Sequence, residues 1–151
     1  MIKEGSKLPE GVLKSLPDLV DRIGQDRDIC CAIVFGGVAT GRLKPLSDID
    51  LAVLLSNTLT KDERILKQLE ILDICNTIFK TDEVDLVVLN DVPPRFVHHI
   101  LKTGKLLFMN DPNEFIDFQE RITQEYLDFK FFRDRFEQAF MEGIGYGGRA
   151  D

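Results

Sequence analysis

The sequence has no long hydrophobic run. No stretch approaches the roughly 20 consecutive apolar residues that a membrane-spanning helix needs, and the N-terminal residues MIKEGSKLPEG lack the apolar core of a signal peptide. We therefore expect a cytoplasmic protein with no membrane partner. At 151 residues the chain has the length of one ordinary domain, which we place at residues 1–142, followed by a flexible, glycine-rich tail at residues 143–151.

Cysteine and basic charge are also scarce. The three cysteines, Cys30, Cys31 and Cys75, are an odd number and lie in apolar segments without metal-ligand spacing, so we expect buried, reduced thiols. The net charge is −7, so the chain lacks the basic field that drives binding to long nucleic acids. An acidic protein that handles a polyphosphate would need bound cations to offset the charge repulsion.

The hydrophobic pattern predicts a series of helices and strands. Thr60 followed by Glu63 forms a capping box at the start of one helix. The last helix carries too many apolar side chains for all of its faces to lie in water. We expect its aromatic stripe to belong to the core, with a contact surface for a partner as the alternative. In chain order we expect either a helix kinked at Pro17 or two short helical turns at 9–23, then strands at 29–35 and 48–55, a helix at 60–80 and a strand at 83–90. A helix at 93–104, a short strand at 105–109 and a long helix at 113–141, either continuous or broken, follow.

This order predicts an α/β (α+β) fold with a mixed central sheet of about four strands flanked by helices. The strands at 48–55 and 83–90 are connected through a helix, so they run parallel if they share a sheet. The strands at 29–35 and 48–55 are joined only by a loop and could be antiparallel.

The stretch FGGVATGRLKPLSDIDLAVLL, residues 35–55, links a double glycine to two aspartates. Alternate residues of a strand face the same way, so Asp48 and Asp50 point to one side. Their Cα atoms would lie about 6–7 Å apart, which allows both carboxylates to reach one cation or a pair of cations. A plain turn or cap role is the alternative for the SDID segment.

Asp85 supplies a third carboxylate. In a parallel pair it lies near the start of its strand, as Asp48 and Asp50 do, and an antiparallel first strand brings Gly36 and Gly37 to the same edge of the sheet. Backbone N–H groups of a glycine turn would then face an acidic, cation-binding cluster, which is the arrangement that a nucleoside triphosphate with Mg²⁺ requires. Because two other acidic residues precede Asp85, an ordinary charged turn is the alternative.

Other motifs for phosphate or metal binding fail on inspection. GGVATGRL has glycines at the P-loop spacing, but Arg42 and Leu43 stand where a P-loop has lysine and a hydroxyl residue. No G-x-G-x-x-G sequence follows a strand. His98 and His99 are adjacent rather than four residues apart, so they do not form a metal pair, and we expect surface or cap roles for both.

The glycines and aspartates together resemble the signature of minimal nucleotidyltransferase (MNT) domains of the DNA polymerase β-like superfamily. That signature is Gly-Ser, ten residues, Asp-x-Asp, and a third acidic residue on a later strand. Here the double glycine at residues 36–37 is followed by ten residues and then by Asp48 and Asp50, and Asp85 in VDLVVLN matches the third acidic residue. The resemblance implies a polymerase β-like nucleotidyltransferase fold with a long C-terminal helix.

The resemblance also implies roles for these residues. Asp48 and Asp50 would bind Mg²⁺, two ions in all, and Asp85 would serve as a ligand or as the base for the acceptor. Gly36 and Gly37 would offer backbone amides to the nucleotide. An acceptor hydroxyl would attack the α-phosphorus of ATP, and pyrophosphate would leave.

The loop before the aspartates adds two candidates and one departure from the family. Arg42 and Ser47 are candidate nucleotide-binding residues, with an exposed loop charge and a turn cap as the alternatives. Gly37 stands where the family has serine. Loss of a hydrogen bond to a charged group costs roughly 1.5–3 kcal/mol, which would reduce nucleotide binding or rate by about 10- to 150-fold.

Small stand-alone members of this family resemble the antitoxin half of toxin–antitoxin pairs whose partner is an all-helical HEPN ribonuclease. The resemblance implies that the chain transfers AMP from ATP to a tyrosine hydroxyl of such a toxin and silences it. Two alternatives stay open. One is an antitoxin of this fold that neutralises its partner by binding alone, and the other is a nucleotidyltransferase that acts on a small molecule.

Overall fold

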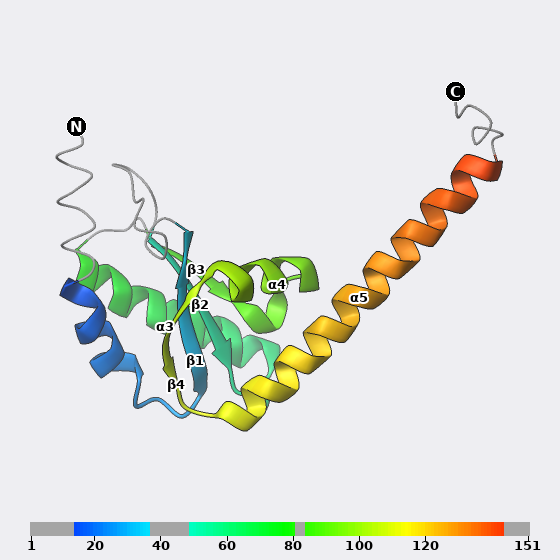
Figure 1. Cartoon of the computed structure of the whole chain (residues 1–151). Coiled ribbons are helices and arrows are strands. Elements are labelled where there is room, and N and C mark those ends of the chain that lie inside the picture. The colour runs from blue at the N-terminus through cyan, green and yellow to red at the C-terminus, as the bar shows by residue number, and fades with distance from the viewer. Residues whose placement is uncertain (1–13, 37–48, 81–83, 144–151) are drawn as a thin grey trace, which may run out of the picture.

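The computed structural model describes residues 14–36, 49–80 and 84–143, and within them a four-stranded mixed sheet with helices on both faces (Figure 1). The strand order is β3-β2-β1-β4. The elements are β1 (Ile29–Phe35), β2 (Ile49–Leu55), α3 (Lys61–Phe79), β3 (Val84–Val88), η1 (Leu89–Asp91), α4 (Pro94–Thr103), β4 (Lys105–Met109) and α5 (Pro112–Gly143), preceded by a helical segment at 14–23.

The strand directions match those inferred from the connections. β2 runs antiparallel to β1 and parallel to β3, and β4 runs antiparallel to β1 on the other side. The link from β2 to β3 passes through α3, which is the crossover that a parallel pair requires. The predictions of a mixed four-stranded sheet and of a parallel second and third strand are confirmed.

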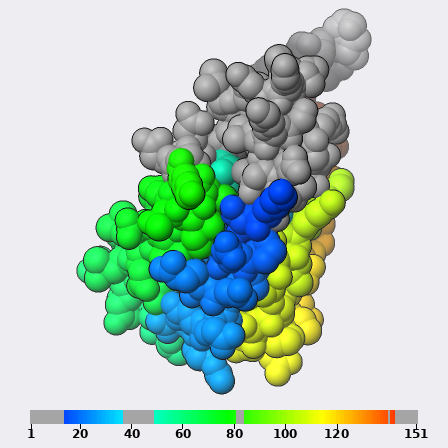
Figure 2. Space-filling model, turned by 90° about the vertical axis from the view of Figure 1, so that its left-hand side faces the viewer, coloured from blue at the N-terminus to red at the C-terminus, as the bar shows by residue number. Residues whose placement is uncertain are grey.

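Two apolar layers sandwich the sheet. On one face, Leu19 of the 14–23 helix and Ile71 of α3 pack against alternate residues of the strands. Figure 2 shows this side of the molecule, where the blue segment that includes the 14–23 helix lies between green α3 and the yellow segment. On the other face, Val97 of α4 and Phe118 of α5 cover the remaining strand residues. Both strand faces are therefore buried, which explains why the β1 and β2 sequences are continuously apolar.

Local signals at the ends of the helices are confirmed. The Thr60 side chain accepts a hydrogen bond from the Glu63 backbone N–H, and the Glu63 carboxylate accepts one from the Thr60 backbone N–H. Pro94 is the first residue of α4, and the Gly104 backbone N–H donates to the Ile100 carbonyl at its end. These interactions satisfy backbone groups that a helix terminus leaves without partners.

The third strand is shorter than predicted. β3 ends at Val88, and Leu89–Asp91 form a turn of 3-10 helix. The Asn90 side chain accepts a hydrogen bond from the Leu55 backbone N–H and donates one to the Leu55 carbonyl, both at 2.9 Å. The Asn90 side-chain amide thus replaces the backbone hydrogen bonds of β3 at the end of β2. The apolar sequence typical of a strand therefore runs on past Val88, where β3 itself ends.

The long last helix is continuous, and the expectation that its whole aromatic stripe is core is wrong. Phe118 and Ile122 are buried, but Phe132 and Phe136 are 68% and 60% exposed. Figure 1 shows the reason, because α5 runs past the sheet and its C-terminal half extends beyond the body. Helical periodicity identifies one face of a helix but not whether another element covers that face.

The cysteines lie where the composition predicted. Cys30, Cys31 and Cys75 are buried and free, and burial raises the pKa of the Cys75 thiol to about 12. All three are core side chains, and the Cys30 thiol also donates a hydrogen bond to the Asp111 carbonyl. In the described part of the chain, no helix is both long and apolar enough to cross a membrane.

Candidate active site

Three strand ends bring the candidate site together. Phe35 at the end of β1 lies opposite Asp50 near the start of β2, and Asp50 lies beside Asp85 near the start of β3. Neighbouring strands are about 4.8 Å apart, and residues in register point to the same face. The two carboxylates are therefore adjacent side chains on one edge of the sheet.

The burial pattern makes this edge accessible. Asp50 is half-buried and Asp85 is exposed, whereas the next residues inward, Leu51 and Leu86, are buried. The carboxylates thus stand at the boundary between the apolar core and the surface. A ligand can approach them without any opening of the core.

Gly36 closes the first strand directly against the Asp50 carboxylate. Its φ is +68°, a left-handed conformation that glycine adopts at little cost. A Cβ atom at this position would overlap the Asp50 carboxylate. Any residue other than glycine would therefore strain the backbone and displace a site carboxylate, so the first glycine of the pair has a structural requirement at the site.

The described residues hold only part of the predicted site. Gly37, Arg42, Ser47 and Asp48 lie outside them. Within the described ranges, no group of three histidine, cysteine, aspartate or glutamate side chains is placed to hold a metal ion. A third carboxylate for the pair formed by Asp50 and Asp85 would have to come from residues outside the described ranges, among them Asp48. The roles assigned to Gly37, Arg42, Ser47 and Asp48 stay predictions.

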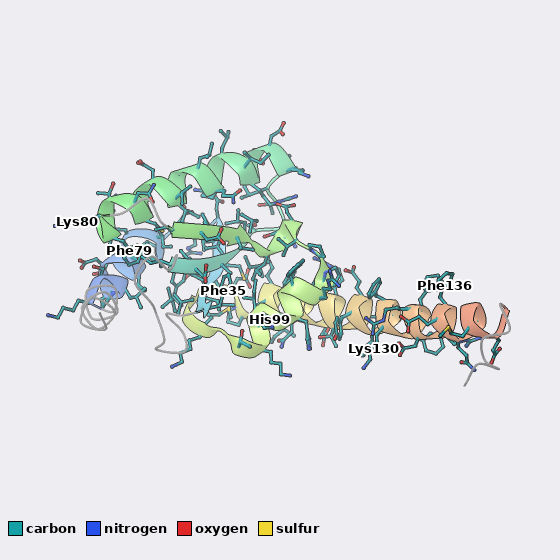
Figure 3. The ribbon with its side chains drawn as sticks, turned by 90° about the horizontal axis from the view of Figure 1, so that it is seen from above. Phe35, Phe79, Lys80, His99, Lys130 and Phe136 are labelled. Atoms are coloured by element: carbon teal, nitrogen blue, oxygen red, sulfur yellow. The ribbon has the colours of Figure 1, made fainter. Side chains whose placement is uncertain are left out.

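Phe35 is a site residue that the sequence reasoning did not single out. It is half-buried and packs against the apolar layer beneath α4 and α5. Because Phe35 is in register with Asp50, it shares the face of the carboxylates. Seen from above, Phe35 and His99 lie on the side of the sheet opposite α3 (Figure 3). Strand alternation, which was applied to the aspartates, also identifies this side chain.

The two histidines lie in α4 and do not join the carboxylates as a metal pair. His98 is half-buried, and its ring stacks on Tyr126 of α5 with a centroid distance of 4.4 Å and an interplanar angle of 8°. It is part of the α4–α5 packing, so the expected surface or cap role is wrong for His98. His99 is exposed, as expected.

A comparison with known families supports the interpretation of this end of the sheet as part of a nucleotidyltransferase. The family described as Polymerase beta, Nucleotidyltransferase matches residues 18–113, which is more than half of the chain. The chain belongs to this nucleotidyltransferase family. The match includes all four strands and therefore the whole edge on which Asp50 and Asp85 lie.

Individual relatives agree with the family assignment. A protein adenylyltransferase MntA from Aphanizomenon flos-aquae (strain 2012/KM1/D3) is 34% identical over 95 residues, which cover 60% of this chain. The match spans 63% of the length of that relative.

Solved structures show the fold. A chain from a toxin–antitoxin structure with AMP-PNP superposes with a TM-score of 0.59 at 21% identity, covering 88% of this chain and 98% of that one. A mutant MntA–HpeT toxin–antitoxin structure gives a TM-score of 0.59 at 20% identity, with the same coverage. The predicted polymerase β-like nucleotidyltransferase fold with a long C-terminal helix is confirmed.

Proposed function

We propose that this chain is a Mg²⁺-dependent protein adenylyltransferase that acts as an antitoxin. It transfers AMP from ATP to a tyrosine hydroxyl on an all-helical HEPN ribonuclease toxin and releases pyrophosphate. The family assignment supports nucleotidyl transfer, and the name of the MntA relative supports a protein as acceptor. The observation that carries the proposal is the register of β2 and β3, which places Asp50 beside Asp85.

The residues present fit a magnesium site. Mg²⁺ prefers carboxylate oxygens together with phosphate oxygens and water, and Asp50 and Asp85 offer adjacent carboxylates at an accessible edge. Gly36 leaves room for the Asp50 carboxylate where a Cβ would overlap it. Asp48, Asp50 and Asp85 would hold the cation. Bound there, Mg²⁺ would neutralise charge on the triphosphate and on the leaving pyrophosphate.

The side chains of the protein would divide the remaining work. Asp85 is the more exposed carboxylate, so we assign it the acceptor side, where it takes the proton of the tyrosine hydroxyl. The hydroxyl oxygen forms a bond to the α-phosphorus, and the bond to pyrophosphate breaks with its electron pair. Backbone amides at Gly36 and Gly37 would orient the phosphates, as N–H groups of glycine turns do for other anions.

The first test uses the full chain with labelled ATP, Mg²⁺ and the toxin encoded beside it. The wild-type chain should label the toxin, and Asp85→Asn should slow transfer by about 10²- to 10⁴-fold, the range expected for loss of a general base. Asp73→Asn, at an exposed position on α3, is the matched control and should transfer normally. Full labelling by Asp85→Asn would contradict the assigned role.

The second test measures nucleotide binding alone by calorimetry. Replacing both Asp48 and Asp50 by asparagine should abolish Mg²⁺-dependent binding of ATP while the fold, followed by circular dichroism, stays intact. Unchanged affinity in this double variant would show that the metal lies elsewhere.

A second candidate function is an antitoxin that acts by binding alone. The observation that favours it is Gly37, which replaces the serine of the family signature. Gly37→Ser should raise affinity for nucleotide or the rate of transfer by about 10- to 150-fold if the chain is a weakened enzyme. An unlabelled toxin that is nevertheless silenced, both with wild-type protein and with Gly37→Ser, would establish the binding-only function.

A further inference from the structure

The C-terminal end of α5 presents an apolar surface that no other described element covers. We call residues 130–143 the distal α5 segment. Every residue in it whose burial the structure describes is exposed, including Phe131, Phe132 and Phe136 at 60–68%. An isolated helix of this length is marginal in water. A second surface that covers these rings would stabilise both the rings and the helix.

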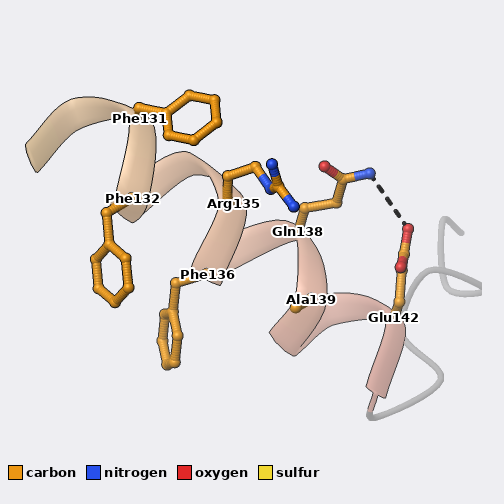
Figure 4. Close-up of a pocket in the computed structure, with 7 residues that line it drawn as sticks. All are labelled: Phe131, Phe132, Arg135, Phe136, Gln138, Ala139 and Glu142. Atoms are coloured by element: carbon orange, nitrogen blue, oxygen red, sulfur yellow. Dashed lines mark hydrogen bonds between the residues drawn. The ribbon is translucent and has the colours of Figure 1, made fainter. Parts of the chain in front are cut away.

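Side chains that project from two sides of the distal α5 segment border a shallow, open groove (Figure 4). Its volume is about 810 Å³. Phe132 and Phe136, whose ring centroids are 6.4 Å apart, lie along it, and Ala139 provides a small side chain one turn after Phe136. When two helices pair, a large side chain of one helix can insert into the space beside a small side chain of the other, which is knobs-into-holes packing.

The groove carries opposite charges along its length. Arg135 lies near its middle, and Glu142 lies two helical turns later on the same side. The Arg135 guanidinium stands over the ring of Phe131 at 5.3 Å, and the Glu142 carboxylate accepts a long hydrogen bond of 3.4 Å from Gln138. Both charged groups are exposed, so a partner with the reverse order of charges would find both within reach.

A second copy of this chain has that reverse order when it runs antiparallel. An alignment that seats Phe136 of one copy over Ala139 of the other also places Arg135 of one copy beside Glu142 of the other. The two-fold axis repeats both contacts, as an isologous interface requires.

We propose that the distal α5 segment pairs antiparallel with the same segment of a second copy, with Phe136 over Ala139 and Arg135 beside Glu142 across the interface. A phenylalanine presents about 150–250 Å². With the exposures of Phe131, Phe132 and Phe136, these rings offer roughly 600–950 Å² of apolar surface over both copies, which is below the size of standard specific interfaces. The dimer is therefore weak and depends on concentration. It uses neither Asp50 nor Asp85 and is independent of the proposed transfer reaction.

The test is sedimentation of the full chain, without nucleotide or toxin, over a concentration series. The weight-average mass of wild-type protein should rise from 17.2 kDa towards twice that value. Phe136→Ala should raise the dissociation constant at least about tenfold, because it removes a central buried anchor. Phe96→Ala, a control at a 52% exposed position on α4, should leave the dissociation constant unchanged. A wild-type chain that stays monomeric over the whole concentration series would overturn the proposal. Binding of the distal α5 segment to a different protein would not rescue it.

A charge exchange tests the antiparallel register. Arg135→Glu and Glu142→Arg should each weaken the dimer several-fold, and the variant that carries both changes should recover wild-type association. Arginine and glutamate are both helix formers, so circular dichroism should show an unchanged helix content in all three variants. A double variant that remains as weak as the single ones would rule out this register.

Discussion

The two halves of α5 carry the same aromatic pattern and have opposite environments. Phe118 and Ile122 in the first half are 5% exposed and pack on the sheet beside α4, whereas Phe132 in the second half is 68% exposed. The sequence period continues without a break, and so does the helix. What changes is the neighbour, since the sheet ends before the helix does (Figure 1). A helical stripe therefore shows which side chains will share an interface, and the rest of the fold decides whether that interface lies within the chain.

The largest effect on stability should come from truncating a buried side chain in the first half of α5. Phe118→Ala should lower the free energy of unfolding by about 3–5 kcal/mol, because it removes a buried ring and leaves a cavity. Phe132→Ala should change it by no more than about 0.5 kcal/mol in dilute protein, where the ring is exposed. Urea denaturation of both variants measures the difference. Equal losses would show that the two halves do not differ as described.

The junction between the halves should give an intermediate effect. Tyr126 stacks on His98 where α5 leaves the body, and aromatic pairs contribute about 0.5–1.5 kcal/mol beyond their buried area. Tyr126→Ala should therefore destabilise the protein by about 1–2 kcal/mol, measured by the same denaturation. Tyr126→Phe keeps the ring and should retain most of the stability. A phenylalanine variant as unstable as the alanine variant would assign the effect to the hydroxyl group instead.

The smallest effects should come from ion pairs, and they should differ between the body and the distal α5 segment. Arg64 binds both carboxylate oxygens of Asp91 at 2.7 and 2.9 Å, and this hydrogen bonding holds the pKa of Asp91 below its ordinary value. Arg133 and Asp134 approach only to 3.7 Å, with both side chains about half exposed. Asp91→Asn should cost about 1 kcal/mol at neutral pH, and Asp134→Asn almost nothing.

The stability that the Arg64–Asp91 ion pair contributes should also depend on pH in a defined direction. Because the folded state lowers the pKa of Asp91, the unfolded state binds more protons below an ordinary aspartate pKa of about 4, and stability rises with pH through that window. The contribution is complete above the unfolded pKa and is lost as the pH falls through the folded value. Wild-type and Asp91→Asn unfolding free energies should therefore converge in acid. A constant gap across the acidic range would show that the pair is not linked to protonation.

Much of the fold followed from short-range patterns. The continuous apolar runs predicted β1 and the described part of β2, because strands buried on both faces carry no polar alternation. Thr60 and Glu63 predicted the start of α3 through a capping box that is complete within four residues. The end of β3 was missed, since the Asn90 side chain that replaces the ladder bonds to Leu55, 35 positions earlier.

The candidate site was only partly accessible to the same reasoning. Strand alternation put Asp50 on one face, and the helical crossover made β2 and β3 parallel. Their register depends on how two separate strands slide along each other, which no local rule determines. The contact between Gly36 and the Asp50 carboxylate likewise depends on the antiparallel pairing of β1 with β2.

The sequence by itself determined the elements, their caps and the pairing of residue types that marks a nucleotidyltransferase edge, because those features depend on neighbours within a few residues. Only the tertiary structure decided that Asp50 stands beside Asp85 and that half of α5 leaves the core. Both outcomes depend on where one element ends relative to another. That relation is set by the packing of the whole sheet, to which residues far apart in the chain contribute together.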